Sequence, residues 1–110
     1  MGSKLKELNE KSFKEFINQE IALVSFGAPW CHACHRVTPI LEELMNHFKG
    51  KAGFAKMDVV KNPGVSSRYG IMSLPNILIF KKGKVTEQII GTSTKKAIEE
   101  KIRKVISRHI

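Results

Sequence analysis

The sequence predicts a three-layer α/β domain, with a central mixed sheet of about four or five strands between about four helices. Along the chain, segments with the composition of strands alternate with segments of helical periodicity. Some of these strands are apolar throughout, as expected of strands that helices cover on both faces. A Lys82-Gly83 pair then joins two consecutive strands as a hairpin. With 110 residues, 42% of them hydrophobic, the chain is expected to form a single domain over residues 1–110.

The first elements are expected before the cysteines. A short strand is predicted around residues 5–8, followed by a short helix. Ser12 and Glu15 have the Ser-x-x-Glu spacing of a capping box, which predicts Ser12 as the N-cap of that helix. Its apolar face consists of Phe13, Phe16 and Ile17. Residues 21–26 are almost entirely apolar, which predicts a strand that is buried on both faces.

A long amphipathic helix is predicted after the cysteines and is expected to end at Gly50. The cysteines therefore lie where a buried strand turns into a helix. The apolar face of this helix carries Val37, Ile40, Leu41, Leu44, Met45 and Phe48.

The second half of the chain supplies the remaining strands. Residues 54–60 are expected to form a second core strand, followed by a turn at Asn62-Pro63-Gly64 and a short helix to Tyr69. Residues 76–80 form another buried strand, and residues 85–90 pair with it through the hairpin, nearer an edge of the sheet.

The last predicted helix carries much of the formal net charge of +9. Thr94 is expected to cap it, and its lysines and arginines are interpreted as a solvated face. No aromatic interleaving or Gly-Arg repeat accompanies the charge, so no nucleic-acid partner is predicted. The charge predicts faster encounter with acidic partners. The buried stripe of this helix consists of Ile98, Ile102, Val105 and Ile106.

Both cysteines lie in the segment Pro29-Trp30-Cys31-His32-Ala33-Cys34-His35. Three chemistries use such a cluster: reversible disulfide exchange, metal binding, and covalent attachment of haem at Cys-x-x-Cys-His. At the first turn of a helix, unpaired N–H groups and the helix dipole favour the thiolate of Cys31. Cys34 lies one turn further along and is expected to face inward. Cys31 can then attack a partner's disulfide, and Cys34 can resolve the mixed disulfide.

The segment Val24-Ser25-Phe26-Gly27-Ala28-Pro29-Trp30-Cys31-His32-Ala33-Cys34 resembles the active-site segment of thioredoxins. The resemblance covers essentially the whole chain and implies a thioredoxin fold with a WCHAC active site. Further matches follow in the family's order: Pro39-Ile40-Leu41, Ala55-Lys56-Met57-Asp58, Asn62-Pro63, Tyr69-Gly70-Ile71, Leu74-Pro75-Asn76 and Gly91.

The resemblance implies a thiol–disulfide oxidoreductase that reduces protein disulfides, with Cys31 as the attacking nucleophile and Cys34 as the resolving cysteine. The redox-active pair itself would do the chemistry, so no cofactor and no metal are expected. Pro75 matches the family's active-site cis-proline, which would expose the backbone of Leu74 beside Cys31 to a substrate strand. The residues implied in substrate binding are Trp30, Leu74, Pro75 and Gly91.

Pro39 is implied as a structural residue. A proline inside a helix leaves the carbonyl four residues earlier, that of His35, without its N–H donor. The active-site turn is therefore expected to be offset from the rest of the helix by a kink.

Ser25 departs from the family pattern, because thioredoxins usually place a buried aspartate there. That aspartate assists proton transfer to and from the second cysteine, and serine cannot act as a general base at neutral pH. Lys56, expected nearby, would lack its usual carboxylate neighbour. We predict slower proton transfer at Cys34, or transfer through water or His35.

His32-Ala33 is a second departure, because thioredoxins usually have Gly-Pro between the cysteines. A histidine beside Cys31 can stabilise its thiolate by charge or by a hydrogen bond, which makes the disulfide a better oxidant. A more oxidising oxidase or isomerase is therefore an alternative function, unless His32 is simply solvated at the rim. Gly27, where thioredoxins often have tryptophan, also loosens the match around the site.

Two alternatives belong to another class of protein. Cys31, Cys34 and His35 fit a c-type haem signature, although the predicted elements leave no haem-sized pocket and no export signal is evident. A zinc or iron–sulfur site would also need His32, and these four ligands cannot turn toward one ion from a single helical turn without distorting it. A two-cysteine metal site completed by a second chain stays open.

The remaining expectations concern partners and compartment. The resemblance implies a thioredoxin-reductase-type electron donor and protein disulfides as substrates. The chain is expected to be a cytoplasmic monomer without a membrane partner. No apolar run approaches the roughly 18 to 20 residues that span a bilayer, and no secretory signal is evident. His47 and His109 are expected on the surface.

Overall fold

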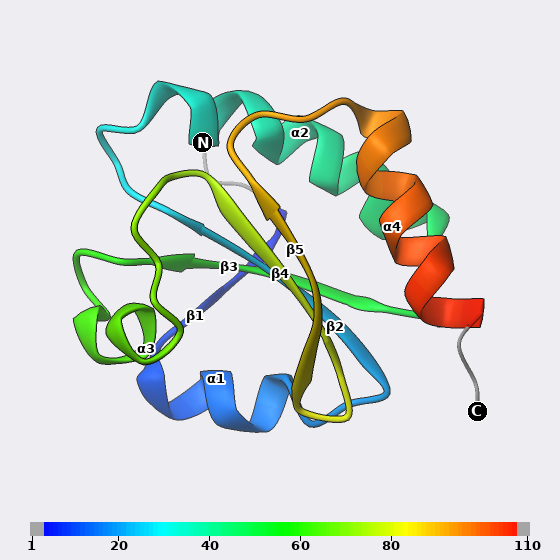
Figure 1. The fold of residues 1–110 in the computed structure, drawn as a ribbon, viewed down its shortest axis with the longest axis horizontal. Helices are drawn as coiled ribbons and strands as arrows, with labels where there is room; N and C mark the ends of the chain where they lie inside the picture. The colour runs from blue at the N-terminus through cyan, green and yellow to red at the C-terminus, as the bar shows by residue number, and fades with distance from the viewer. Residues whose placement is uncertain (1–3, 108–110) are drawn as a thin grey trace.

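The computed structural model describes residues 4–107, which form a sheet between two pairs of helices (Figure 1). Helices α1 and α3 cover one face of the sheet, and α2 and α4 cover the other. This confirms the predicted three-layer α/β architecture. The elements in chain order are β1 (Lys6–Leu8), α1 (Glu10–Phe16), β2 (Ile21–Gly27), α2 (His32–His47), β3 (Gly53–Asp58), α3 (Pro63–Arg68), β4 (Asn76–Lys81), β5 (Lys84–Ile90) and α4 (Lys95–Ser107).

The sheet is mixed, with the strand order β1-β3-β2-β4-β5. Strand β3 pairs in parallel with both β1 and β2, whereas β4 is antiparallel to β2 and β5. Strand β5 is an edge strand, as predicted. None of the helices between residues 4 and 107 is long and apolar enough to cross a bilayer.

Strand β2 lies at the centre of the sheet and supplies both layers of the core. Its residues from Ile21 to Phe26 are buried, which confirms that both faces are covered. Ile21 and Leu23 pack in the cluster beneath α2 and α4. Ala22, Val24 and Phe26 pack in the opposite cluster with α1 and α3. Because successive side chains alternate, Ser25 and Gly27 belong to the α2 face.

The start of α1 differs from its prediction. The N-cap is Asn9, three residues before the predicted Ser12, and the helix begins at Glu10. The Asn9 side chain accepts the N–H of Ser12 at 2.8 Å, and the Ser12 hydroxyl accepts the N–H of Asn9 at 3.0 Å. This reciprocal pair satisfies two unpaired donors of the first turn, so Ser12 completes the capping box from inside the helix. The predicted Ser12–Glu15 box was wrong.

Helix α2 begins directly at the cysteine cluster and continues through Pro39 to His47. The helix ends three residues before Gly50, which adopts a positive φ of 84° in the following turn. Pro39 lies inside the helix as predicted, and the kink stays a prediction. The predicted apolar face is confirmed by the buried side chains of Val37, Leu41, Leu44 and Phe48, against which Ile40 and Met45 pack.

Two details of the second half follow from local hydrogen bonds. Strand β3 ends at Asp58, two residues earlier than predicted, because the Asp58 Oδ1 accepts the N–H groups of Val60 and Lys61 and turns the chain. The hairpin between β4 and β5 has a two-residue loop, Lys82-Gly83, with positive φ at both residues. Such turns match the twist of the flanking strands.

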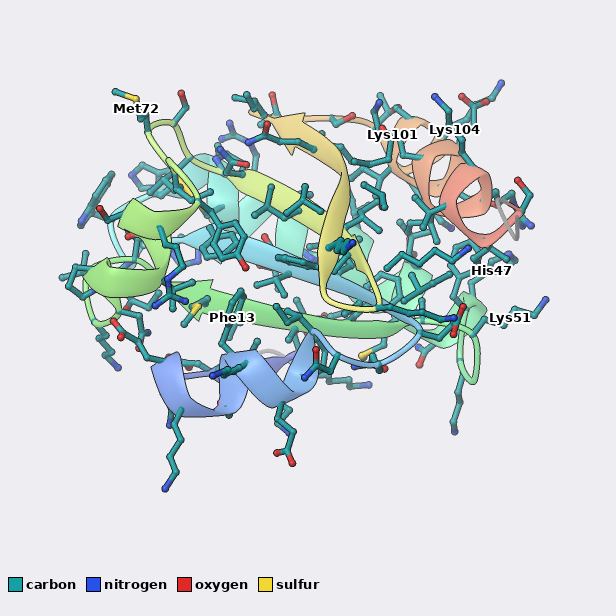
Figure 2. All side chains as sticks on the ribbon, turned by 60° about the horizontal axis from the view of Figure 1, so that its bottom comes forward. Phe13, His47, Lys51, Met72, Lys101 and Lys104 are labelled. Carbon is teal, nitrogen blue, oxygen red and sulfur yellow. A yellow bond between two sulfur atoms is a disulfide. The ribbon has the colours of Figure 1, made fainter. Side chains whose placement is uncertain are left out.

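Most charged side chains of helix α4 are exposed, as expected of a solvated face. The Thr94 Oγ1 accepts the N–H of Ala97 at 3.1 Å, and the predicted stripe packs on the sheet. Lys101 and Lys104 lie 3.2 and 3.7 Å from the carboxylate of Glu87, on the side of the molecule away from the loop that carries Met72 (Figure 2). Also on α4, close to His47 at the C-terminal end of α2, a hydrogen bond from Arg103 lowers the pKa of Glu99.

Candidate active site

Cys31 and Cys34 lie at the junction of β2 and α2, and a disulfide joins them. Cys31 is the N-cap of α2, one residue before the helix proper, and both cysteines are only 8% exposed. The backbone N–H of Cys34 donates to the Cys31 Sγ at 3.2 Å. An N–H of the first helical turn therefore points at the sulfur, which is the arrangement that favours a thiolate at Cys31 after reduction.

The residue before a cis-proline packs against the cysteine pair. The peptide bond between Leu74 and Pro75 is cis, as the resemblance implied, and Leu74 packs against the cysteines. The N–H of Gly91 donates to the Pro75 carbonyl at 2.8 Å. Gly91 has a φ of 82°, which favours glycine. Leu74 therefore lies beside the cysteines, and the hydrogen bond links the next residue, Pro75, to Gly91.

An apolar groove runs along the accessible side of Cys31. Trp30 is 69% exposed and Met72 is 93% exposed, although both are large apolar side chains. Figure 2 shows Met72 projecting from the loop that precedes β4. Exposed apolar surface of this kind is typical of a binding site. The groove is lined by Trp30, Cys31, Val59, Ile71, Met72 and Leu74.

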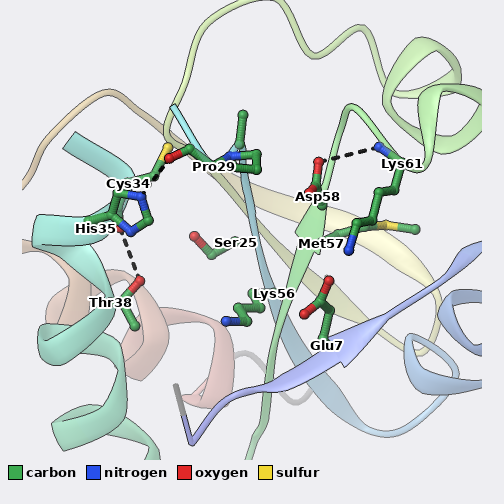
Figure 3. Close-up of a pocket in the computed structure, with 12 residues that line it drawn as sticks. Glu7, Ser25, Pro29, Cys34, His35, Thr38, Lys56, Met57, Asp58 and Lys61 are labelled. Carbon is green, nitrogen blue, oxygen red and sulfur yellow. Dashed lines mark hydrogen bonds between the residues drawn. The ribbon is translucent and has the colours of Figure 1, made fainter. Parts of the chain in front are cut away.

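A second hollow lies on the other side of the pair, behind Cys34 (Figure 3). This cavity has a volume of about 270 Å³ and contains several charged side chains. It is lined by Glu7, Ser25, Gly27, Ala28, Pro29, Cys34, His35, Thr38, Lys56, Met57, Asp58 and Lys61.

Strand pairing explains how distant residues reach this cavity. Ser25 on β2 is in register with Lys56 on β3, and Lys56 is in register with Glu7 on β1. The three residues form a polar row across the sheet, and Figure 3 shows their side chains directed into the same space. Ser25 is buried, Lys56 is half-buried and Glu7 is exposed at the mouth. The predicted proximity of Ser25 and Lys56 is therefore confirmed.

The two histidines of the cluster have different surroundings. The Nε2–H of His35 donates to the Pro29 carbonyl at 2.9 Å, so only Nδ1 of that ring can accept a proton. His32 is exposed, and its side chain makes no hydrogen bond to any residue between 4 and 107. His47 is exposed on α2, as predicted, and His109 lies outside the described residues.

Sequence reasoning missed several lining residues on both sides of the pair. Glu7 is the most informative of them, because its strand is three residues long and its place depends on pairing with β3. Its one signal in the sequence is its position two residues after Leu5, which puts both side chains on the same face of the strand. Leu5 packs beneath α2 and α4. The others include Thr38, Met57, Asp58 and Lys61 in the cavity, and Val59, Ile71 and Met72 in the groove.

Metal binding finds no support in this geometry. Within residues 4–107, no group of three or more histidine, cysteine, aspartate or glutamate side chains is placed to hold a metal ion. His35 is turned toward the Pro29 carbonyl, as described above.

A CxxC pair at the start of a helix, within a three-layer α/β domain, defines a thiol–disulfide oxidoreductase of the thioredoxin fold. A sequence model of the family described as Thioredoxin matches residues 4–104. The chain belongs to the thioredoxin family, whose members act on protein disulfides through their cysteine pair and need no cofactor.

Individual relatives agree with this assignment. The chain is 40% identical over 104 residues to Thioredoxin 2 of Chlorobaculum tepidum, covering 93% of this chain and 95% of that protein. It is 33% identical to thioredoxin of Staphylococcus haemolyticus, with coverage of 94% and 96%. A solved structure of a mutant thioredoxin from Halobacterium salinarum superposes with a TM-score of 0.84 at 24% identity, covering 97% and 96% of the two chains. That last likeness concerns the fold alone.

Proposed function

We propose that the protein reduces disulfides of other proteins, with Cys31 as nucleophile and Cys34 as resolving cysteine. The observation that carries the proposal is the position of Cys31 at the start of α2, where the Cys34 N–H points at its sulfur. The Cys31 thiolate attacks a substrate disulfide and releases one substrate thiolate. Cys34 then attacks Cys31, forms the Cys31–Cys34 disulfide and releases the second thiolate.

Substrate binding is assigned to the groove beside Cys31. An extended substrate segment would pair with the backbone of Leu74 next to Pro75, and its apolar side chains would contact Trp30. Support comes from the high exposure of Trp30 and from the packing of Leu74 against the cysteines. Gly91 would hold Pro75, and with it the adjoining Leu74, in place through its hydrogen bond to the Pro75 carbonyl.

The reducing direction is favoured over an oxidase or isomerase. An oxidising pair needs extra stabilisation of its reduced form, and His32 was the candidate to provide it. The exposed position of His32 supports the opposite interpretation, in which water solvates the ring and its influence on Cys31 is small.

The proposal extends to the protein's setting. We infer one thioredoxin domain that acts as a monomer and receives electrons from a thioredoxin-reductase-type donor. A reducing compartment such as the cytoplasm suits a dithiol that must be regenerated. Light scattering of the purified chain checks the monomer, since a dimer would double the mass.

The test is the reduction of insulin by dithiothreitol, followed by turbidity. The protein is expected to accelerate the reaction, and Cys31→Ser is expected to remove the acceleration entirely. Cys34→Ser is expected to trap a mixed disulfide on Cys31 that mass spectrometry detects. Acceleration that survives Cys31→Ser would overturn the assignment.

A further inference from the structure

The cavity behind Cys34 contains a carboxylate that the resolving step can use. We propose that Glu7 accepts, through water in this cavity, the proton that Cys34 loses when it resolves the mixed disulfide. This inference rests on the proposed function of the cysteine pair, and it adds a residue from a distant strand to that reaction.

The resolving step needs a proton acceptor because a thiolate, and not a thiol, is the nucleophile. The S–H bond of Cys34 breaks, and its sulfur forms the bond to the Cys31 sulfur. The bond between Cys31 and the substrate sulfur breaks, and the substrate leaves as a thiolate with the electron pair. That thiolate takes a proton from solvent, while the proton of Cys34 passes to Glu7. Cys34 is 8% exposed, so bulk water has little direct access to it.

Strand register places Glu7 within reach of this proton. Glu7 and Ser25 flank Lys56 in one row. Because neighbouring strands lie about 4.8 Å apart, the backbone positions of Glu7 and Ser25 are about 10 Å apart in total. The glutamate side chain projects into that interval and lines the same cavity as Cys34 (Figure 3).

This polar row is an exception on its face of the sheet. On the side of the row toward α4, the positions on the same face are buried and apolar, including Leu23, Phe54 and Ile77. Ser25 is small and Gly27 has no side chain, so space remains between Cys34 and the row. The cavity volume of about 270 Å³ exceeds the share of about 30 Å³ that one water molecule takes in the liquid. Its charged walls provide the polar partners that such water needs.

The other ionisable groups of the cavity are cationic or already hydrogen-bonded. Lys56 and Lys61 carry ammonium groups, which have no lone pair to accept a proton. Asp58 already uses its Oδ1 to accept two backbone N–H groups. His35 is hydrogen-bonded to the Pro29 carbonyl through Nε2, which leaves only Nδ1 to accept a proton.

Glu7 differs from all of these. Within residues 4–107, its carboxylate makes no hydrogen bond and no ion pair. Because it is exposed at the mouth of the cavity, it can return the proton to bulk solvent before the next turnover.

The experiment follows the reaction of the reduced protein with Ellman's reagent by stopped flow. The first thionitrobenzoate is released when Cys31 attacks, and the second when Cys34 resolves the adduct. We expect Glu7→Gln to slow the second release about tenfold at pH 6 to 7 and to leave the rate of the first release unchanged. The expected effect is smaller than that of a direct general base because the proton passes through water. The difference should vanish near pH 9, where hydroxide takes the proton directly. Failure of the first release would instead refute the function of the pair.

Two controls separate this role from a general effect of charge or folding. Glu15→Gln makes the same change of charge on the exposed face of α1, and both release rates should match the unmodified protein. In a Ser25→Asp background, which supplies a nearer carboxylate, Glu7→Gln should have little further effect. A second release as fast in Glu7→Gln as in Glu15→Gln would overturn the proposal. So would a slowing that occurs with Asp58→Asn but not with Glu7→Gln.

Discussion

The two sides of the Cys31–Cys34 pair have opposite chemistry. Beside Cys31 lies an apolar groove, and its two largest exposed side chains are those of Trp30 and Met72. Behind Cys34 lies a cavity lined with charged groups, reached by the row Ser25, Lys56 and Glu7. One cysteine faces a surface suited to binding a protein chain, and the other faces a space suited to moving a proton.

This difference matches the division of labour in dithiol exchange. The attacking cysteine must meet a large substrate, whereas the resolving cysteine reacts inside the protein and must lose a proton there. Changes in the groove should therefore alter substrate recognition. Changes in the cavity should alter the resolving step or the environment of Cys34.

Gly27→Ala tests the cavity side of the cysteine pair, because it adds a side chain next to Cys34. A Cβ at this position would lie 3.0 Å from the Sγ of Cys34 and 3.1 Å from its Cβ. We expect the oxidised protein to lose about 1 to 3 kcal/mol of unfolding free energy, the usual cost of overpacking. The reduced protein should lose less, since a free thiol can rotate away. Denaturant unfolding of both forms measures this, and equal losses would contradict the account.

Ser25→Asp tests proton transfer on the cavity side by adding a carboxylate close to Cys34. The rate of resolution is expected to rise about tenfold at neutral pH, because a positioned base takes the proton. Stopped-flow measurement at several pH values provides the test, and Ser25→Ala serves as the control with no added base. An unchanged rate in Ser25→Asp would show that proton transfer does not limit resolution.

Trp30→Ala tests the groove side. Loss of this exposed ring should lower kcat/KM for insulin about fivefold, or about 1 kcal/mol, in the range of ordinary interface residues. The reaction with Ellman's reagent, which is too small to fill the groove, should be unaffected. Val60→Ala is the matched control, because Val60 is 59% exposed but lies outside the groove. Equal effects on both substrates would argue against a binding role.

His32→Ala is expected to have the smallest effect. His32 lies at the rim and is exposed, so its removal should change the reduction potential by less than about 15 mV, or about 0.7 kcal/mol. Equilibration with glutathione buffers measures the shift. A fall of several tens of millivolts would mean that His32 stabilises the Cys31 thiolate and sets the redox character of the pair.

The sequence predicted the cysteine pair well because its geometry is local. A buried strand, a short break and an amphipathic helix determine where Cys31 lies, and these elements are adjacent along the chain. The predicted neighbourhood of Pro75 and Gly91 came from the family resemblance, since nothing in the residues alone reveals a cis bond or a contact over this separation.

The cavity could not be predicted in the same way. Glu7 reaches it only through the register of β1 with β3, and a three-residue strand carries too little periodicity to fix a register. The wrong N-cap has a similar origin, because Asn9 and Ser12 are both good capping residues. The end of β1 at Leu8 places Asn9 at the helix start, and the sequence pattern alone does not locate that end.

The reduction potential of the Cys31–Cys34 pair tests the central claim, that this pair is a reductant of protein disulfides. Equilibration against dithiothreitol or glutathione buffers should give a value near about −270 mV, as for thioredoxins. A value near about −180 mV, the range of disulfide isomerases, would contradict the claim and assign the protein to oxidation or isomerisation.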